Sequence, residues 1–362
     1  MILEKQNILF FTRTMKLGGT ENVILQLCEI FKPLVNKIVV CSCGGVNVQK
    51  LQNMGIKHYE IYDIEKKSPA VFFKTIIMLH YIIISENISL IHTHHRMAAF
   101  YISLIKFYNK CYFFNTSHNT FTNKVILTRF AYKNANLIAC GEMVKKNLLE
   151  KFSIPDKQVT VIHNAVKPFN EDIQVDSLIN ELHANGFFVI GNVGRLSEQK
   201  GMEYYIQAIP SIIKKHPEAR FLIIGNGEDE DKLKLLVNDI GLNEVIYFTG
   251  YRTDIQNLMS QLDLVVLSSL WEGLPLTPIE AFSVGKAVVA TAVDGTIEVI
   301  ENGKDGLLVE KKNYQQLSDC INWIIDHPNE RKVMEKAAIE KYISEFSMEK
   351  LAAGYINCYK NV

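Results

Sequence analysis

The stretch FFVIGNVGRLSEQKG, residues 187–201, contains the pattern that decides the fold. The run Phe187–Asn192 is mostly apolar, which predicts a buried strand of a parallel sheet. Gly194-Arg195-Leu196 follows as a loop, and Lys200-Gly201 marks the start of a helix-length segment. A strand that leads through a short loop into a helix is the repeating unit of α/β proteins. The stretch therefore predicts a parallel sheet with crossover helices.

The same unit recurs in both directions along the chain. Before this stretch, the predicted strands are residues 7–12, 37–43, 56–61, 90–92, 112–116 and 137–140, with helical patterns at 20–31, 70–85, 97–108 and 124–132. After it, the predicted strands are 220–224, 245–248, 264–267, 287–290 and 306–308, and the stretch from residue 313 has a helical pattern to the end. The polar segment Asn170–Asp176 is the best linker between the two series. We expect two doubly wound domains, residues 1–168 and 169–346, with ligands at the carboxyl ends of their strands.

The composition is typical of a globular protein with sizeable cores. Of the 362 residues, 48% are hydrophobic and 22% are charged. The longest apolar stretch, Val71–Ile84, is broken by Lys74 and His80 and is shorter than the roughly 20 residues of a membrane span. We expect no signal peptide, and the odd number of seven cysteines, without a Cys-x-x-Cys motif, favours the reducing cytoplasm. The absence of G-x-G-x-x-G and P-loop motifs argues against dinucleotide oxidoreductases and NTPases.

Charge is distributed unevenly along the chain. Up to residue 170 there are 21 Lys and Arg against 10 Asp and Glu, and from residue 171 there are 18 against 29. The basic first half suits an anionic partner such as a membrane surface or a lipid pyrophosphate, unless the two halves simply attract each other. Aromatic and basic residues also alternate there in two clusters: Phe100, Tyr101, Lys106, Phe107, Tyr108, Lys110 and Tyr112, and Phe121, Lys124, Arg129, Phe130, Tyr132 and Lys133. This pattern favours contact with an anionic membrane, although buried helix faces would produce it too.

Three features of the first half are candidate binding elements. Gly18-Gly19-Thr20 opens a helix, where two glycines permit close approach of an anion, unless Thr20 is an ordinary N-cap. The histidines of His92-Thr-His94-His95 end a strand, and a lining or packing role is favoured over metal binding because their spacing is not that of a zinc helix. His118 follows another strand, where it can donate to a sugar hydroxyl or to developing negative charge, or be an ordinary surface histidine.

The second half carries the sharper pattern. Arg195 and Lys200 follow one strand and together could neutralise a diphosphate. Gly225-Asn226-Gly227 follows the next strand as a second loop open to close approach. Glu272 and Glu280 are separated by seven residues in EGLPLTPIE, with Glu280 expected in the first turn of a helix that starts near Thr277. Carboxylates accept hydrogen bonds from sugar hydroxyls, although near a helix start they are often only partners of its dipole.

Taken in order, these motifs resemble the retaining GT-B glycosyltransferases of family 4, also called glycosyl transferases group 1. The resemblance rests on GGTE at 18–21, His118, Gly194-Arg195 with Lys200-Gly201, GNG at 225–227 and the E-x7-E pattern, and extends from about residue 7 to 345. It implies two Rossmann-like domains that face each other across a cleft. It also implies a C-terminal helix, within residues 347–362, that crosses back to the first domain.

The resemblance implies a role for each candidate residue. Arg195 and Lys200 would hold the donor diphosphate, Glu280 the ribose and Glu272 the transferred sugar. His118 would contact the sugar near its primary hydroxyl, and His118, Glu272, Arg195 and Lys200 form the catalytic set. The remaining donor-binding residues that it implies are Gly18, Gly19, Gly225, Tyr251, Arg252, Gly273, Leu274, Leu276 and Thr277.

The implied activity is transfer of a hexose or N-acetylhexosamine, with retention of configuration, from a nucleotide diphosphate sugar to a glycan or lipid-linked acceptor. We expect UDP as the nucleotide, surface polysaccharide such as capsule as the product, and no cofactor, metal or nucleic acid. The expected location is cytoplasmic, with peripheral contact at the inner face of the plasma membrane. Two alternatives remain open: a GT-B nucleotide-sugar epimerase and a non-catalytic nucleotide-sugar-binding subunit.

Overall fold

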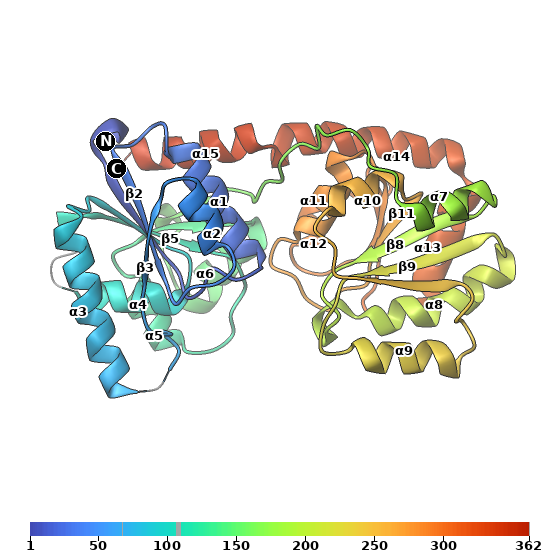
Figure 1. The fold of residues 1–362 in the computed structure, drawn as a ribbon, viewed down its shortest axis with the longest axis horizontal. Helices are drawn as coiled ribbons and strands as arrows, with labels where there is room; N and C mark the ends of the chain where they lie inside the picture. Colours follow the sequence, from blue (N-terminus) through green and yellow to red (C-terminus); the bar gives the residue numbers. More distant parts are fainter. Residues whose placement is uncertain (67, 106–109, 362) are drawn as a thin grey trace. The chain divides into compact units, whose positions relative to one another are not determined.

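A computed structural model describes residues 1–66, 68–105 and 110–361 of the chain. The chain divides into two compact units (Figure 1). Unit 1 comprises Met1–Asn164 and Leu351–Val362, and unit 2 comprises Ala165–Lys350. The boundaries expected at residues 168 and 346 each lie about four residues from this division.

Unit 1 is built on a seven-stranded parallel sheet with the order β3-β2-β1-β4-β5-β6-β7. Its strands are β1 Asn7–Phe11, β2 Lys37–Ser42, β3 Lys57–Glu60, β4 Leu90–Thr93, β5 Tyr112–Ser117, β6 Asn136–Ala139 and β7 Val159–Val161. The first six were predicted, because strands buried on both faces appear as short apolar runs, whereas the three-residue β7 was not. The strand order reverses at β1, between its neighbours β2 and β4, and ligands of doubly wound sheets bind at such a switch point.

Seven α-helices complete the described part of unit 1. They are α1 Gly19–Phe31, α2 Val48–Asn53, α3 Pro69–Ser85, α4 Arg96–Leu104, α5 Val125–Tyr132, α6 Glu142–Phe152 and α15 Met348–Lys360. The six-residue α2 was not predicted, since it is too short to show a helical period. The helix expected over 97–108 ends at Leu104, and residues 106–108 lie outside the described part of the chain.

The C-terminal helix α15 belongs to unit 1, as expected. Its Tyr355 and Tyr359 are buried, and the Tyr359 ring stacks on Phe31 of α1 with ring centroids 4.7 Å apart. Figure 1 shows α15 in red beside the blue α1. Aromatic burial of this kind contributes roughly 1.5–3 kcal/mol per side chain, so residues from the end of the sequence help to hold the first sheet together.

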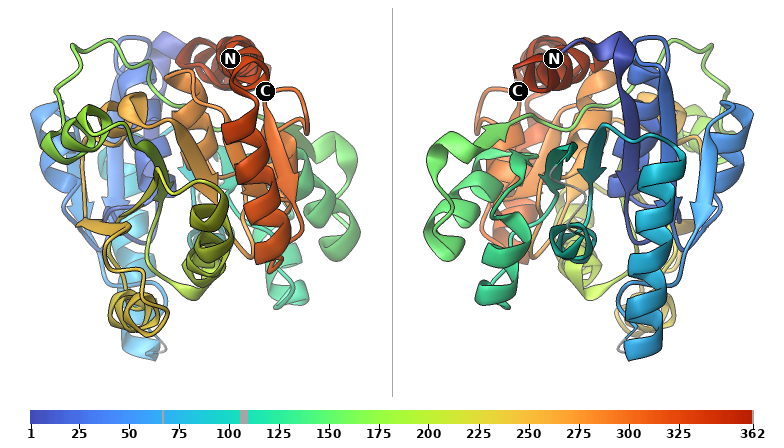
Figure 2. Two further views of the ribbon diagram at one scale, coloured as in Figure 1. Left: turned by 90° about the vertical axis from the view of Figure 1, so that its right-hand side faces the viewer. Right: turned by 90° about the vertical axis from the view of Figure 1, so that its left-hand side faces the viewer.

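Unit 2 is built on a six-stranded parallel sheet with the order β10-β9-β8-β11-β12-β13. Its strands are β8 Phe188–Val193, β9 Ala219–Ile224, β10 Ile246–Gly250, β11 Leu264–Leu267, β12 Val288–Thr291 and β13 Gly306–Val309. Its α-helices are α7 Ser177–Ala184, α8 Met202–Lys215, α9 Glu230–Asp239, α10 Ile255–Gln261, α11 Leu276–Ser283, α12 Thr296–Val299, α13 Tyr314–Asp326 and α14 Pro328–Lys341. Helices lie on both faces of the sheet, and α8 lies beside α13 on one of them (Figures 1 and 2).

The pattern of the C-terminal stretch predicts a helix from residue 313 to the end. The structure instead divides this stretch into α13, α14 and α15. Helix α13 ends before His327, because Pro328 cannot donate a backbone hydrogen bond and starts the next helix. A π-helical turn, Tyr342–Phe346, and the extended Ser347 then separate α14 from α15.

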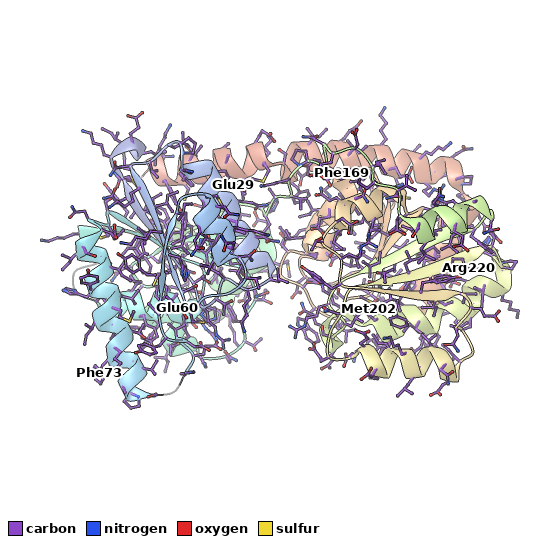
Figure 3. All side chains as sticks on the ribbon, viewed as in Figure 1. Glu29, Glu60, Phe73, Phe169, Met202 and Arg220 are labelled. Carbon is purple, nitrogen blue, oxygen red and sulfur yellow. The ribbon has the colours of Figure 1, made fainter. Side chains whose placement is uncertain are left out.

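The side chains divide between buried cores and an outer surface (Figure 3). Met202, at the start of α8, is 2% exposed in the core of unit 2, whereas Phe73 of α3 is 63% exposed. In the described residues, no helix is both long and apolar enough to cross a membrane.

Candidate functional site

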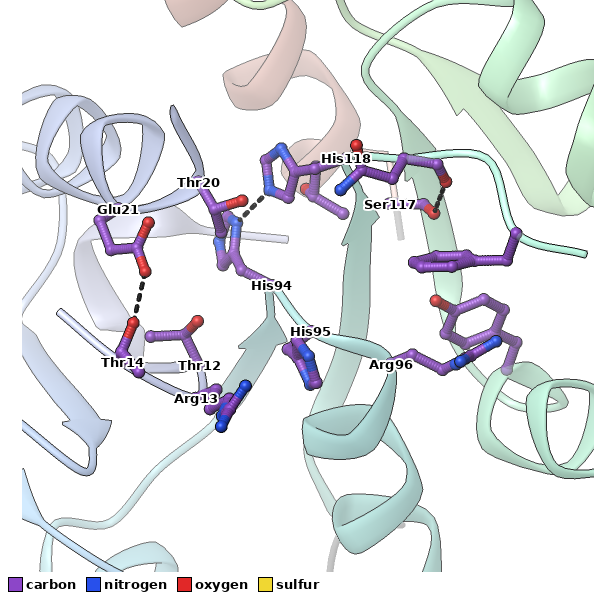
Figure 4. A pocket seen from close by; sticks show the side chains of 14 residues that line it. Thr12, Arg13, Thr14, Thr20, Glu21, His94, His95, Arg96, Ser117 and His118 are labelled. Atoms are coloured by element: carbon purple, nitrogen blue, oxygen red, sulfur yellow. Dashed lines mark hydrogen bonds between the residues drawn. The ribbon is translucent and has the colours of Figure 1, made fainter. Parts of the chain in front are cut away.

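The loops after β1, β4 and β5 of unit 1 enclose a cavity of about 230 Å³ at the carboxyl end of the sheet. His118 lines it, together with His94, Thr20 and Glu21 (Figure 4). His118 and the histidines at the end of β4 are more than twenty residues apart in the sequence. The parallel sheet brings them together because β4 and β5 are neighbours with their carboxyl ends at one edge.

His94 and His118 share a hydrogen bond, with 3.1 Å between His94 Nδ1 and His118 Nε2. His92 lies one layer deeper, where its ring nitrogens pair with Tyr359 Oη and with Thr116 Oγ1, the latter at 2.8 Å. Burial lowers the pKa of His118 to about 4 and holds the pKa values of His92 and His94 well below their ordinary range. At neutral pH this end of the sheet therefore presents neutral imidazoles.

The Gly18-Gly19 segment begins helix α1 next to this cavity. Gly18 is the extended N-cap residue and Thr20 lies inside the helix, so the alternative that Thr20 caps the helix is wrong. A Cβ on Gly18 would approach Glu21 Oε2 to 2.5 Å, and Glu21 also accepts a hydrogen bond from Thr14 Oγ1 at 2.6 Å. The glycine therefore leaves room for a carboxylate that lines the cavity.

The remaining histidine of the strand-end cluster has a local structural role. His95 is the N-cap of α4 and accepts a hydrogen bond from the backbone N–H of Met97 at 3.2 Å. Across residues 1–66, 68–105 and 110–361, no three His, Cys, Asp or Glu side chains are grouped so that they could hold a metal ion.

In unit 2, Lys200 and Glu272 meet at the carboxyl end of the sheet. Lys200 Nζ lies 2.6 Å from Glu272 Oε1, and Ser269 Oγ donates to the same oxygen at 2.7 Å. The lysine and glutamate side chains are 17% and 7% exposed, respectively. Gly201, next to Lys200, lets this segment approach the loop after β11 that leads to Glu272. It has a φ of +55°, and a Cβ there would lie 2.4 Å from the Ser268 carbonyl oxygen. The two residues predicted from separate motifs thus form one buried ion pair.

Arg195 lies on the exposed part of the same edge. Its Nε lies 3.0 Å from Glu228 Oε2, and the two side chains are 72% and 57% exposed. An exposed ion pair contributes little to stability, about 0–1 kcal/mol. The guanidinium is therefore free to exchange its partner for a bound anion.

The GNG loop serves to hold the loop that carries Arg195. Gly225 has a φ of +143°, and a Cβ there would lie 2.0 Å from the Gly194 carbonyl oxygen. Gly227 is approached in the same way by the Leu196 carbonyl oxygen, at 2.1 Å. The room that these glycines provide is thus filled by the protein's own backbone.

Glu280 lies in the second turn of α11, which corrects the expectation of a first-turn position. The helix begins at Leu276 with Pro275 as its N-cap, one residue earlier than predicted, because Pro275 already has the extended conformation that precedes a helix. Burial raises the pKa of Glu280 to about 7, and the charge of Lys200 opposes this rise. Glu280 therefore interacts electrostatically with Lys200, the cation that is paired with Glu272.

The other predicted donor-binding residues surround this edge. Gly273, Leu274 and Thr277 are buried, whereas Leu276 is partly exposed. A Cβ on Gly295, in the loop after β12, would lie 1.7 Å from the Gly273 carbonyl oxygen, so this neighbouring loop supports the segment that carries Glu272.

Tyr251 and Arg252 differ in what they can offer a ligand. Tyr251 follows β10 and is 51% exposed. Arg252 forms ion pairs with Asp176 at 2.9 Å and with Asp254 at 2.7 Å, which raise its pKa. The Arg252 side chain is thus used to fasten the start of α7, and its backbone remains available to a ligand.

One residue of these edges, Ser269, and the partner of another, His94, were not predicted. Ser269, which donates to Glu272, stands only three positions before it, but a serine after a strand carries no distinguishing signal. His94 was named only as one of a cluster, and its partnership with His118 depends on the pairing of β4 with β5.

Two family models match the chain. Residues 17–168 match the model described as Glycosyltransferase Family 4, and residues 176–341 match that described as Glycosyl transferases group 1. The solved structure of Anabaena HepE in complex with UDP aligns with a TM-score of 0.85 at 21% identity, covering 99% of this chain and 100% of that one. A structure of the same Anabaena protein in complex with UDP-glucose aligns with a TM-score of 0.83 at 22% identity, covering 98% and 100%.

Curated relatives are similar over part of their length. An uncharacterized glycosyltransferase of Methanocaldococcus jannaschii is 28% identical over 63% of this chain and 60% of its own length. The UDP-Gal:alpha-D-GlcNAc-diphosphoundecaprenol alpha-1,3-galactosyltransferase of Escherichia coli is 28% identical over 61% of this chain and 59% of its own length. The chain thus matches about three fifths of the length of these relatives.

Proposed function

This chain belongs to the group 1 glycosyltransferases of family 4, which have the GT-B fold, and from this premise we propose that it transfers a hexose or N-acetylhexosamine from a UDP-sugar to a glycan or lipid-linked acceptor with retention of configuration. Support for the donor comes from the Anabaena structures, whose ligands are UDP and UDP-glucose. Support for the acceptor comes from the Escherichia coli relative, which acts on a diphosphoundecaprenol-linked sugar. Surface polysaccharide, such as capsule, is the corresponding product.

The observation that carries the proposal is the ionic group at the carboxyl end of the unit 2 sheet. Lys200 and Ser269 both donate hydrogen bonds to Glu272 Oε1. Exposed Arg195 and the partly buried Glu280 lie on loops and helices of the same edge. Cations for a diphosphate and carboxylates for hydroxyl groups are the set that a nucleotide diphosphate sugar requires.

Donor binding uses these residues in a fixed order along the substrate. The Arg195 guanidinium and the Lys200 ammonium hold the diphosphate, Glu280 accepts from the ribose hydroxyls, and Glu272 accepts from the transferred sugar. Tyr251 and the backbone of Arg252 contact the base. The ion pair with Glu272 holds the Lys200 ammonium in the site before the donor binds. When the diphosphate binds, it and Glu272 share this ammonium.

Chemistry then proceeds at the front face of the sugar. The acceptor oxygen attacks on the side from which UDP departs, and an oxygen of the leaving phosphate takes the acceptor's proton. A covalent route through Glu272 is the alternative. The two bonds that Glu272 Oε1 accepts, from Lys200 and Ser269, reduce its nucleophilicity and favour the front-face route.

Metal independence is part of the proposal. Arg195 and Lys200 supply fixed positive charge that stabilises the diphosphate, a role that a divalent cation has in other transferases.

The acceptor is proposed to be reached at the inner face of the plasma membrane through unit 1. Helix α5 presents Ile126, 86% exposed, and Phe130, 44% exposed, near the basic residues Lys124 and Lys133. Two members of the aromatic clusters do not face outward, because Tyr101 and Tyr132 are 2% and 1% exposed and serve the core. Lys106, Phe107 and Tyr108 lie outside the described residues.

The membrane proposal is tested by flotation with vesicles. The protein should float with anionic vesicles at low salt, be released at high salt, and ignore neutral vesicles, because each basic residue near an anionic surface contributes about 1 kcal/mol. The substitution Ile126→Asp should abolish flotation, whereas Ile339→Asp, at another exposed isoleucine in unit 2, should not. Failure to float at low salt would point to a soluble acceptor.

The activity itself is tested with a panel of UDP- and GDP-sugars. We expect slow donor hydrolysis with one or a few UDP-sugars, and faster UDP release when a diphosphopolyprenol-linked sugar is added. NMR of the product should show the anomeric configuration of the donor. Interconversion of UDP-sugars without UDP release would instead identify an epimerase, and binding without turnover a non-catalytic subunit.

A further inference from the structure

Three histidine rings form a stacked column at the carboxyl end of the unit 1 sheet. His92 stacks on His94 with ring centroids 4.3 Å apart, and His94 stacks on His118 with centroids 5.4 Å apart. The column starts in the core, where His92 is 0% exposed, and ends in the cavity that His118 lines (Figure 4). The order of the rings thus leads from the buried sheet to the place where a substrate would bind.

The inner end of the column is fixed by the C-terminal helix. His92 Nδ1 pairs with Tyr359 Oη, while His92 Nε2 pairs with Thr116 Oγ1, which also pairs with Tyr355 Oη at 3.0 Å. Phe10 packs against both His92 and His94, each with a centroid distance of 5.8 Å. The His94 ring is thus held between neighbours and cannot turn freely.

His94 has one hydrogen-bonding partner and one buried nitrogen without any. Its Nδ1 is bonded to His118 Nε2, while its Nε2 is buried and has no hydrogen-bond partner among the described residues. Both rings are neutral, because burial lowers their pKa values, so each carries one hydrogen. The shared hydrogen bond can therefore be made in only two ways.

The orphaned nitrogen decides between these two arrangements. If His118 Nε2 donates to His94 Nδ1, then His94 must place its own hydrogen on the orphaned Nε2. If His94 Nδ1 donates, the orphaned Nε2 carries only a lone pair. A buried N–H without an acceptor is rarer in proteins than an acceptor without a donor, so the second arrangement is favoured.

We propose that His94 is a positioning residue that donates from Nδ1 to His118 Nε2 and thereby fixes the hydrogen of His118 on Nδ1, the nitrogen that is not bonded to His94. His118 then offers substrate a hydrogen-bond donor and is not a base at that atom. The group that accepts from His118 Nδ1 is a substrate oxygen with a free lone pair, such as a sugar hydroxyl oxygen. This role toward substrate rests on the proposed function, whereas the hydrogen position does not.

The hydrogen position can be measured without any substrate. In protein labelled with ¹⁵N-histidine, long-range ¹H–¹⁵N spectra distinguish a ring nitrogen that carries hydrogen from one that does not. We expect His118 to carry hydrogen on Nδ1 and His94 on Nδ1. Hydrogen on His118 Nε2 would overturn the proposal, whether or not the protein transfers sugar.

Variants of His94 test its positioning role. In His94→Asn the side-chain amide can donate from the place of Nδ1, so His118 should keep its hydrogen position and kcat should stay within about threefold of wild type. In His94→Leu the donor is gone, and kcat should fall about tenfold with a smaller change in KM. His58→Asn is the control, because His58 pairs with Ser42 at 2.8 Å elsewhere in unit 1. Equal losses in His94→Asn and His94→Leu would show a purely structural role.

Variants of His118 test the donor directly. His118→Asn retains a donor near the Nδ1 position, whereas His118→Asp offers only acceptors at neutral pH. Asn should therefore retain about tenfold more kcat than Asp. Higher activity in His118→Asp than in His118→Asn would mean that substrate needs an acceptor there, and would overturn the proposal.

Discussion

The carboxyl ends of the two sheets offer substrate different chemistry, although the sheets share one strand order. In unit 1, β1 lies between β2 and β4, and in unit 2, β8 lies in the same way between β9 and β11. The edge in unit 1 presents the neutral His94 and His118. The edge in unit 2 presents the buried Lys200–Glu272 pair.

Burial acts on both edges in the same direction, because it disfavours the charged form of a titratable side chain. It lowers the pKa of His118 to about 4 and raises that of Glu280 to about 7, favouring the neutral form each time. Glu272 is also buried, but Lys200 lies 2.6 Å away. The two edges thus accommodate buried side chains differently, as neutral imidazoles in unit 1 and as a lysine–glutamate ion pair in unit 2.

Loss of the lysine should have the largest effect. In Lys200→Ala, transferase activity should fall about a hundredfold or more, because the diphosphate and Glu272 both lose their cation. Stability should fall by about 3 kcal/mol, since Glu272 is left buried and unpaired. Lys232→Ala is the matched control, because Lys232 pairs with Glu203 at 2.9 Å on the surface of the same unit. An unchanged melting temperature in Lys200→Ala would show that the pair is not the charged centre of this edge.

Loss of the exposed arginine separates binding from stability. Arg195→Ala should weaken UDP-sugar binding about tenfold, because it removes charge-assisted hydrogen bonds to the diphosphate. Its melting temperature should hardly change, since the pair with Glu228 is exposed. Calorimetric titration with UDP measures the first effect and thermal unfolding the second. Glu228→Ala is the control and should bind UDP at least as well as wild type.

The raised pKa of Glu280 predicts a dependence of stability on pH. Between its ordinary value of 4.5 and about 7, the folded protein binds more protons at Glu280 than the unfolded chain does. This stabilising contribution is complete below pH 4.5 and is lost as pH rises through 7. The free energy of unfolding of wild type should therefore fall relative to Glu280→Gln by up to about 3 kcal/mol across this window.

Denaturant titrations at several pH values measure this difference. Glu244→Gln, at an exposed glutamate of the same unit, serves as the control. If the difference in free energy of unfolding between wild type and Glu280→Gln is the same at every pH, the pKa of Glu280 is not raised in the folded protein.

The smallest expected effect is that of a chelator. If Arg195 and Lys200 provide the charge for the diphosphate, then EDTA should leave the transfer rate within about twofold of its value without chelator. Complete loss of activity that manganese or magnesium restores would show that the charged edge is not sufficient by itself.

Much of the architecture could be predicted from the sequence. The strands of both sheets are short apolar runs such as Leu264–Leu267, and their alternation with helical patterns indicated two parallel sheets. The errors were local ones. The helical pattern expected from residue 313 to the end is broken at Pro328, which starts α14, and α11 begins one residue earlier than predicted because Pro275 is its N-cap.

By itself, the sequence determined which residue types follow each strand, and therefore that Lys200, Glu272 and His118 would gather at sheet edges. Only the tertiary structure decided their partners. Lys200 bonds Glu272, and His94 bonds His118, because neighbouring parallel strands end side by side. It also decided their charge, since burial of an imidazole or a carboxyl group sets its pKa, and burial depends on residues far away in the chain, such as Tyr359 beneath the histidine column.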